Sequence, residues 1–187
     1  MASNKRDHLV ETALELFCRD GFHATGIDKI LAESKVAKMT LYNHFKSKDE
    51  LILATMRRLD EQFRNMLMRE VERRGTTPRE RLLALFDVLE DWFASGGFAG
   101  CPFVNASAEF ADPDNPIHVA AAENKRLVFG YVRSLTTAAG ASDPDGLAKG
   151  IALLMEGAVI MAFVAGQADA ASQAKKTTEI LLADAGV

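Results

Sequence analysis

The chain has 187 residues, of which 48% are hydrophobic and 26% are charged, and its formal net charge at pH 7 is −4. A chain of this length and composition can bury a sizeable core in one compact body with a small appended domain. The negative net charge excludes a protein that coats nucleic acid over its whole surface, so any contact with DNA must come from a local basic patch.

Cysteine content and hydropathy bear on the compartment. Two cysteines, Cys18 and Cys101, are too few for a disulfide scaffold and fit a reducing cytosol. The first ten residues are polar and charged, without the apolar stretch of a signal peptide, so we expect a cytoplasmic protein. The most apolar run, residues 151–168, approaches membrane-spanning length, but Glu156, Gln167 and its glycines favour a buried or dimer-forming helix. No membrane partner is expected.

The first predicted element is a helix that ends at Gly21. Apolar residues recur at helical spacing before this glycine, and Phe22 follows it, which is typical of a left-handed glycine cap with a hydrophobic contact just beyond. Thr25 then precedes Asp28 by three residues, and this spacing predicts a capped start for a second helix.

The second and third predicted helices are short and are joined by about three residues. The third spans Lys38 to Phe45, with Leu41 and Phe45 on its inward face. These dimensions are those of a helix-turn-helix, whose second helix enters a DNA major groove. We therefore predict a helix-turn-helix DNA-binding domain over residues 3–50. At about 100° per residue, the opposite, outward face of the third helix comprises Met39, Tyr42, Asn43 and Lys46.

The same stretch carries a local basic patch inside an acidic protein. Between Phe22 and Lys48 there are five lysines against two acidic residues, Asp28 and Glu33. Five minus two leaves an excess of three positive charges, which favours contact with phosphates. The lysines are Lys29, Lys35, Lys38, Lys46 and Lys48.

The run from Thr25 to Leu51 resembles the DNA-binding signature of the tetracycline-repressor (TetR) family of bacterial transcription regulators. It reads TGIDKILAESKVAKMTLYNHFKSKDEL, and its most diagnostic part is T-L-Y-x-H-F-x-S-K-x-x-L. Lys35 and Met39 stand where glycine is common in the family, and Ala37 stands where serine often caps the recognition helix. A non-glycine residue in a left-handed turn and a missing cap each cost on the order of 1 kcal/mol, which a packed domain tolerates. The resemblance implies a regulator that binds double-stranded operator DNA.

Some side chains of this segment are expected to contact the DNA backbone and so position the protein on the duplex. Tyr42, His44 and Lys48 would contact phosphates, which sets the register of the complex rather than its sequence preference. Thr40 would add a hydroxyl to backbone or base. The alternative is that these residues form an ordinary solvated helix end.

Other side chains are expected to read bases in the groove. Asparagine pairs well with adenine, lysine with guanine, and methionine with a thymine methyl group. Lys38, Met39 and Asn43 supply these three types on one helix. The complete set of candidate DNA-binding residues is Thr25, Lys38, Met39, Thr40, Tyr42, Asn43, His44, Lys46 and Lys48.

A long helix, 48–74, is predicted to link the two domains. Ser47 can cap its start and Glu50 can complete the capping box, and one apolar face then continues to Arg73-Arg74. This single helix would join the DNA-binding domain to the rest of the chain.

The rest of the chain reads as a helical body over residues 51–187. Thr77-Pro78 and Asp143-Pro144 are helix start signals, while Gly96-Gly97 and Gly140 are stop signals. With no strand pattern or repeat in the sequence, we predict an all-α protein of about nine helices.

The family resemblance implies an effector pocket enclosed by helices five to eight. Large aromatic residues interleaved with small ones favour a cavity there, although the same side chains can interlock as ordinary core. Apolar walls with a few polar groups suit a small-molecule effector. The candidate pocket residues are Phe86, Trp92, Phe93, Phe103, Asn105, Glu109, Phe110, Phe129 and Met155.

A homodimer is expected, because one recognition helix buries too little DNA surface for a tight specific complex. Small residues in the helix that starts at Pro144 permit a close approach by another helix, and the last helix supplies bulk. Two copies would make a four-helix interface of isologous symmetry, as in the family, although the same faces could pack inside a monomer. The candidate interface residues are Gly150, Leu154, Gly157, Ala158, Met161, Ile180 and Leu181.

Cys101 lies in a Gly-Cys-Pro loop without an adjacent basic residue in sequence to lower its pKa. A buried structural thiol is one interpretation. The other is a thiol-based sensor of electrophiles or oxidants on the same scaffold.

No catalytic residues, metal site or cofactor are predicted. The four histidines are scattered, and no nucleophile, base and orienting group share a defensible motif. The working hypothesis is a repressor that a small, largely apolar effector releases from a palindromic operator. The rival from another class is a small-molecule-binding or enzymatic helical protein with an incidental basic head.

Overall fold

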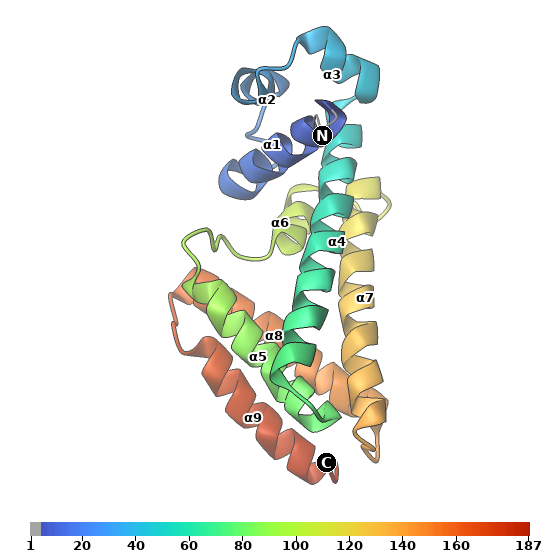
Figure 1. The fold of residues 1–187 in the computed structure, drawn as a ribbon, viewed down its shortest axis with the longest axis vertical. Coiled ribbons are helices and arrows are strands. Elements are labelled where there is room, and N and C mark those ends of the chain that lie inside the picture. Colours follow the sequence, from blue (N-terminus) through green and yellow to red (C-terminus); the bar gives the residue numbers. More distant parts are fainter. Residues whose placement is uncertain (1–4) are drawn as a thin grey trace. The chain divides into compact units, whose positions relative to one another are not determined.

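A computed structural model describes residues 5–187, and the described chain is helical without a β-strand (Figure 1). The predicted all-α fold is confirmed. Residues 3 and 4, the first two of the predicted DNA-binding domain, lie outside the described residues. The helices in the described part are α1 (Lys5–Asp20), α2 (Ile27–Ser34), α3 (Lys38–His44), α4 (Lys48–Arg74), α5 (Pro78–Ala94), α6 (Pro102–Glu109), α7 (Pro116–Ala138), α8 (Pro144–Ala165) and α9 (Ala170–Asp184).

The chain divides into two compact units. The head unit comprises the described residues of Met1–Gln62 together with Cys101–Asn124, and the body unit comprises Phe63–Gly100 together with Lys125–Val187. Helices α4 and α7 therefore contribute residues to both units. The head unit is larger than the helix-turn-helix segment, because α6 and the first turns of α7 pack with it rather than with α5, α8 and α9.

The core of the head unit forms where α1 packs against α2 and α3. The Gly21 N–H donates to Phe17 O at 3.0 Å, and Gly21 has a φ of 88°, which confirms the left-handed glycine cap. The Phe22 ring stacks on the Phe17 ring with centroids 5.3 Å apart. This contact fixes the direction of the chain as it leaves α1.

The capping box predicted at α5 is complete, whereas the one predicted at α4 forms only in half. Ser47 Oγ accepts from the Glu50 N–H at 3.1 Å, while the Glu50 carboxylate accepts from the Lys46 N–H at 2.7 Å rather than from Ser47. At α5, Thr77 Oγ1 accepts from the Glu80 N–H at 3.2 Å, and Glu80 Oε2 accepts from the Thr77 N–H at 3.1 Å. Both pairs satisfy backbone donors that a helix start leaves open.

Within the body unit, α5, α8 and α9 pack on one another (Figure 1). Lys175 of α9 pairs with Asp87 of α5 at 2.6 Å. The loop after α5 passes so close to α8 that a Cβ at Gly100 would lie 2.8 Å from the Phe163 ring, and Gly100 has a φ of +78°. Glycine is therefore required at position 100 by both space and backbone conformation.

Candidate nucleic-acid interface

Helix α3 is anchored by two buried side chains. Leu41 is fully buried and Phe45 is 3% exposed. The Leu41 N–H donates to Ala37 O at 3.2 Å, and the Phe45 N–H donates to Leu41 O at 2.9 Å. Ala37 stands at the N-cap without a side-chain hydrogen bond, as the missing serine predicts. Packing rather than capping therefore holds this seven-residue helix.

The opposite face of α3 points away from the core of the head unit. Met39 is 73% exposed and Tyr42 is 44% exposed, although both are large side chains. Asn43 and Lys46 are also exposed, which confirms the outward face predicted from helical periodicity. A methionine this exposed gains little from folding, and its side chain is available to a partner. The other exposed members of the predicted set are Lys38 and His44, while Thr40 and Lys48 are half-buried.

The turn between α2 and α3 is left-handed at a non-glycine residue. Lys35 has a φ of 55°, the one positive φ of a non-glycine residue in the described chain. The turn is held from α1, because His8 Nε2 lies 3.0 Å from Ser34 O. The Val36 N–H also donates to Ser34 Oγ at 3.4 Å. These contacts offset the strain at Lys35 and fix the angle at which α3 leaves α2.

The lysines around α3 are only partly neutralised. Lys29 pairs with Asp20 at 3.1 Å, and Lys38 lies 3.8 Å from the exposed carboxylate of Asp28. Exposed pairs of this kind are weak and screened by salt, so phosphates can replace the carboxylate of Asp28. Within the described residues, Lys35 has no ion-pair partner.

Thr25 is a correction to the predicted set. Its side chain is fully buried, and its hydroxyl donates to Gly21 O at 2.8 Å. The N-cap of α2 is Gly26, which makes no side-chain cap. Thr25 therefore neither caps α2 nor presents its hydroxyl to DNA, because the carbonyl at the end of α1 takes that donor.

Glu109, predicted to line the effector pocket, instead binds the turn between α1 and α2. One carboxylate oxygen accepts from the Phe22 N–H at 2.9 Å, and the other accepts from the His23 N–H at 2.6 Å. His23 Nδ1 lies 3.1 Å from the same carboxylate, and the His23 ring stacks on Phe110 with centroids 4.6 Å apart. Lys48 Nζ donates to His23 O at 3.2 Å. The end of α6 therefore holds the turn that precedes the helix-turn-helix.

The other predicted pocket residues are distributed over several environments. Phe86 is 1% exposed in the core of the body unit. Trp92 and Phe93 belong to an aromatic cluster around Phe98, with ring centroids 5.1 Å and 4.9 Å from it. In α6, Phe103 is buried and Asn105 is half-buried, both within the head unit. Phe129 and Met155 are the two that line a cavity of the body unit.

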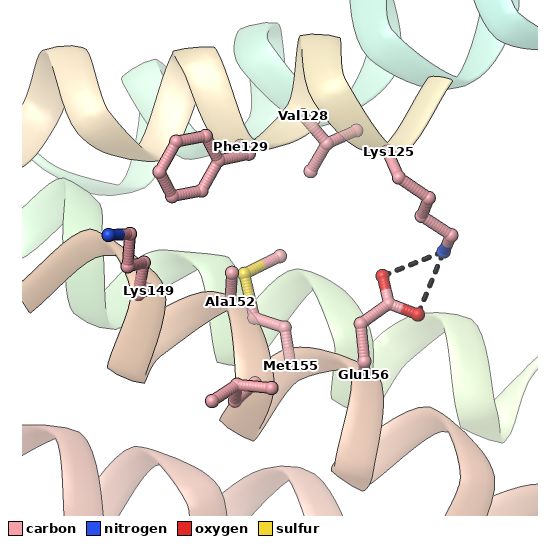
Figure 2. A pocket seen from close by; sticks show the side chains of 8 residues that line it. Lys125, Val128, Phe129, Lys149, Ala152, Met155 and Glu156 are labelled. Carbon is pink, nitrogen blue, oxygen red and sulfur yellow. Dashed lines mark hydrogen bonds and ion pairs between the residues drawn. The ribbon is translucent and has the colours of Figure 1, made fainter. Parts of the chain in front are cut away.

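That cavity lies between α7 and α8 and has a volume of about 500 Å³. Figure 2 shows Val128 and Phe129 of α7 facing Ala152 and Met155 of α8 across it. Lys149 lies at one end, and a Lys125–Glu156 ion pair of 2.7 Å lies at the other. Sequence analysis missed these charged groups because they are ordinary surface residues of two helices that meet only in the tertiary fold. The lining residues are Lys125, Val128, Phe129, Lys149, Ala152, Leu153, Met155 and Glu156.

A second cavity, of about 520 Å³, lies within the head unit between α4 and α7. Its lining includes the acidic residues Asp60, Asp114 and Glu123. The α7–α8 cavity has mostly apolar walls with one net positive charge, so it fits an apolar effector better than this cavity does.

Helices α8 and α9 present a row of exposed apolar side chains. Of the predicted interface residues, Met161 is 41% and Ile180 is 69% exposed, and Gly157 is also exposed. Ala158, by contrast, is 5% exposed and packs inside the unit, so it is unavailable to a partner. Gly150, Leu154 and Leu181 are half-buried. In the described chain, α8 is also the one helix apolar and long enough to cross a membrane by composition, with a mean hydropathy of 1.9 over its most apolar window.

One of the two thiols is buried and the other is half-buried. Cys101 is buried at the N-cap of α6. Burial, with a smaller effect of the neighbouring Cys101, raises the pKa of Cys18 to about 11. At neutral pH the Cys18 thiol is therefore protonated and a poor nucleophile. Residues 5–187 contain no cluster of His, Cys, Asp and Glu that could hold a metal ion.

Comparison with known proteins supports the assignment of α2 and α3 as a helix-turn-helix. Residues 9–55 match the model for bacterial regulatory proteins of the tetR family, and residues 78–178 match the model for the tetracyclin repressor-like C-terminal domain. The HTH-type transcriptional regulator YjdC of Escherichia coli is 24% identical over 182 residues, which cover 95% of this chain and 93% of the relative. The HTH-type transcriptional repressor NemR of Escherichia coli is 27% identical over 128 residues, or 68% of this chain and 64% of the relative.

A solved structure shows the same arrangement of helices. The TetR-family transcriptional regulator SCO4454 from Streptomyces coelicolor is 30% identical and superposes with a TM-score of 0.91, over 100% of this chain and 92% of that one. Members of this family are DNA-binding regulators rather than enzymes, which argues against the alternative that this chain is an enzymatic helical protein. The chain belongs to the TetR family of helix-turn-helix transcriptional regulators.

Proposed function

We propose that the protein is a cytoplasmic, homodimeric repressor that leaves a palindromic operator when a small, largely apolar effector binds its body unit. The observation that carries DNA recognition is the exposed Met39–Tyr42–Asn43 face of α3, held on the buried anchors Leu41 and Phe45. A rigid helix with apolar and amide groups outward is suited to a major groove. The relative NemR is named a transcriptional repressor, which supports repression rather than activation of transcription.

Dimerisation rests on the apolar row of α8 and α9. Leu153 and Val164 are each 74% exposed, and Ile180 is 69% exposed. Side chains of this size in one exposed row are typical of a surface that another copy covers. A second copy is the occupant we propose, because two recognition helices then reach successive major-groove faces about 34 Å apart or a multiple of that distance.

Effector response rests on the contacts that α7 makes at both of its ends. In the body unit α7 supplies Phe129 to the cavity wall. In the head unit the buried Asn124 donates to Asp60 of α4 at 2.8 Å, and His118 Nδ1 lies 2.8 Å from Phe110 O. Phe110 follows Glu109, which binds the α1–α2 turn. An effector that favours another position of α7 would therefore increase the population of a conformation whose head units bind the operator more weakly.

The proposed function is tested by gel shift against the DNA that flanks the gene of this protein. We expect binding to one palindromic segment and a steep fall in affinity as salt rises, because several phosphates are neutralised on binding. Asn43→Ala should weaken binding to the operator and relax its sequence preference, while Lys176→Gln, a change at an exposed position of α9, should leave both unchanged. Equal affinity of the wild-type protein for unrelated DNA would contradict operator recognition.

A further inference from the structure

We propose that the cavity between α7 and α8 binds an amphipathic monoanion, a carboxylate carried on an unbranched apolar chain. The inference names the chemical class of the effector and rests on the proposed function for its regulatory consequence. Binding itself is a property of the cavity and can be measured without DNA.

The charge of the cavity wall selects an anion. Two lysines and one glutamate line it, which leaves one net positive charge. Lys125 Nζ is held by both carboxylate oxygens of Glu156, at 2.7 and 2.8 Å. Lys149 has no hydrogen-bond or ion-pair partner within residues 5–187. Lys149 is therefore the cation of the wall without a carboxylate partner in the protein, and its exposed ammonium is open to the carboxylate of a ligand.

The rest of the wall selects an apolar chain. Val128, Phe129, Ala152 and Met155 are apolar, as is Leu153 at the exposed rim, and no hydroxyl or amide side chain lines the cavity. A polar ligand body would lose its hydrogen bonds to water without replacement. Methionine and phenylalanine walls suit a flexible hydrocarbon, because the thioether side chain adapts its shape to the occupant. The ligand therefore needs one charge and a body without polar groups.

The separation of the charges limits the length of the chain. Lys149 and Glu156 are seven residues apart on α8, which places them about 10 Å apart along the helix axis. Figure 2 shows Phe129 and Met155 in the interval between them. A chain attached to a carboxylate at Lys149 runs over these two residues and ends before the carboxylate of Glu156, which disfavours a second negative charge at that end.

The test uses three ligands of one chain length that differ in charge. Octanoate, 1-octanol and octylamine are titrated into the full-length protein by calorimetry. We expect octanoate to bind about fivefold more tightly than 1-octanol, the size of one partly exposed charge interaction, and octylamine to bind more weakly than both. Equal affinity for the three ligands, or no binding of octanoate, would overturn the proposal.

Two charge variants assign the effect to this cavity. Lys149→Gln should bring octanoate down to the affinity of 1-octanol and leave 1-octanol unchanged. Lys176→Gln, an exposed lysine of α9 outside the cavity, is the matched control and should change neither. Glu156→Gln removes the negative charge from the wall, so octanoate should bind about fivefold more tightly. Loss of the anion preference in Lys176→Gln would place the site elsewhere.

A third variant tests the apolar wall. Ala152→Phe adds a ring to the α8 wall of the cavity, so all three ligands should bind at least about tenfold more weakly. Retained circular dichroism and dimer size would show that the variant is folded. Undiminished binding of octanoate to this folded variant would contradict the assignment of the cavity.

A gel shift with octanoate separates the two proposals. Octanoate that binds but leaves the operator complex intact would contradict effector release while the cavity assignment stands. Operator binding that other compounds relieve, with no octanoate binding in calorimetry, would contradict the cavity assignment while the repressor function stands.

Discussion

The carboxylate of Glu109 accepts a 2.6 Å hydrogen bond from the backbone N–H of His23, which lies 86 positions earlier in the chain. The same carboxylate accepts from the Phe22 N–H, so one side chain satisfies two adjacent backbone donors. Gly21 leaves room for this, since a Cβ there would lie 3.2 Å from Glu109 Oε1. The last residue of α6 is thus part of the structure that orients α2 and α3.

Loss of this carboxylate should loosen the turn between α1 and α2. Glu109→Ala leaves two backbone N–H groups without their protein partner, which costs about 1 kcal/mol at this partly exposed position. We expect the melting temperature to fall by about 2–4 °C and the operator affinity to fall with it. Thermal unfolding and a gel shift measure both. Glu179→Ala, on the exposed side of α9, is the control, and an equal loss in that variant would show that the effect is nonspecific.

The two faces of α3 should separate DNA binding from folding. Asn43→Ala should weaken operator binding by about 1–3 kcal/mol and relax sequence preference at one base pair, with unchanged circular dichroism. Leu41→Ala, which removes three carbon atoms from a fully buried position, should lower the free energy of unfolding by about 2–5 kcal/mol. If the folded Asn43→Ala variant kept wild-type affinity and selectivity, Asn43 would not be a residue that reads a base in the groove.

Lys46 should contribute to affinity without contributing to sequence preference. Its side chain is exposed beside α3, so Lys46→Gln should weaken binding to all DNA sequences alike. The slope of log affinity against log salt should fall by about 1, as expected for one lost phosphate contact. An unchanged slope in fluorescence anisotropy titrations would show that Lys46 does not contact phosphate.

A charge in the exposed row of α8 should prevent dimerisation. Met161→Glu places a carboxylate in the proposed interface, and sedimentation should show a monomer at micromolar concentration with little operator affinity. Met68→Glu is the matched control, because Met68 of α4 is 38% exposed and Met161 is 41% exposed. Dissociation in the Met68 variant, or a dimeric Met161 variant, would contradict the assignment of the interface.

The capping box of α5 should make stability depend on pH in acid. The Thr76 hydroxyl and the Thr77 and Thr76 N–H groups lower the pKa of Glu80 to about 2. A depressed folded-state pKa stabilises the fold above the ordinary carboxyl pKa of 4.5, and this contribution is lost as the pH falls through about 2. Glu80→Gln should therefore be less stable than the wild type at pH 7, with the difference shrinking below pH 4.5. A difference that stays constant in urea unfolding down to pH 2.5 would contradict this origin.

Helical periodicity and capping signals were sufficient to predict the helices of this chain. The alternation of Leu41 and Phe45 with Met39 and Asn43 determined which face of α3 is exposed, because helical geometry alone relates these positions. The Ser47 cap and the Thr77 capping box are equally local, since donor and acceptor are three or four residues apart. Thr25 is the exception, because its hydroxyl reaches the carbonyl of Gly21 instead of the start of α2.

Only the tertiary structure decided what the residues far apart in sequence do. Glu109 and Phe110 looked like pocket residues, but they bind the α1–α2 turn, a contact across more than 80 positions that no local pattern encodes. Lys149 likewise has no distinguishing neighbours in sequence, and it gains a role because α8 packs beside α7 at the cavity. The sequence by itself determined the helices, their inward and outward faces and the family, because these depend on spacing within about one turn. The contact between α6 and the α1–α2 turn and the charge of the cavity depend on which helices meet, and that is a property of the packed fold.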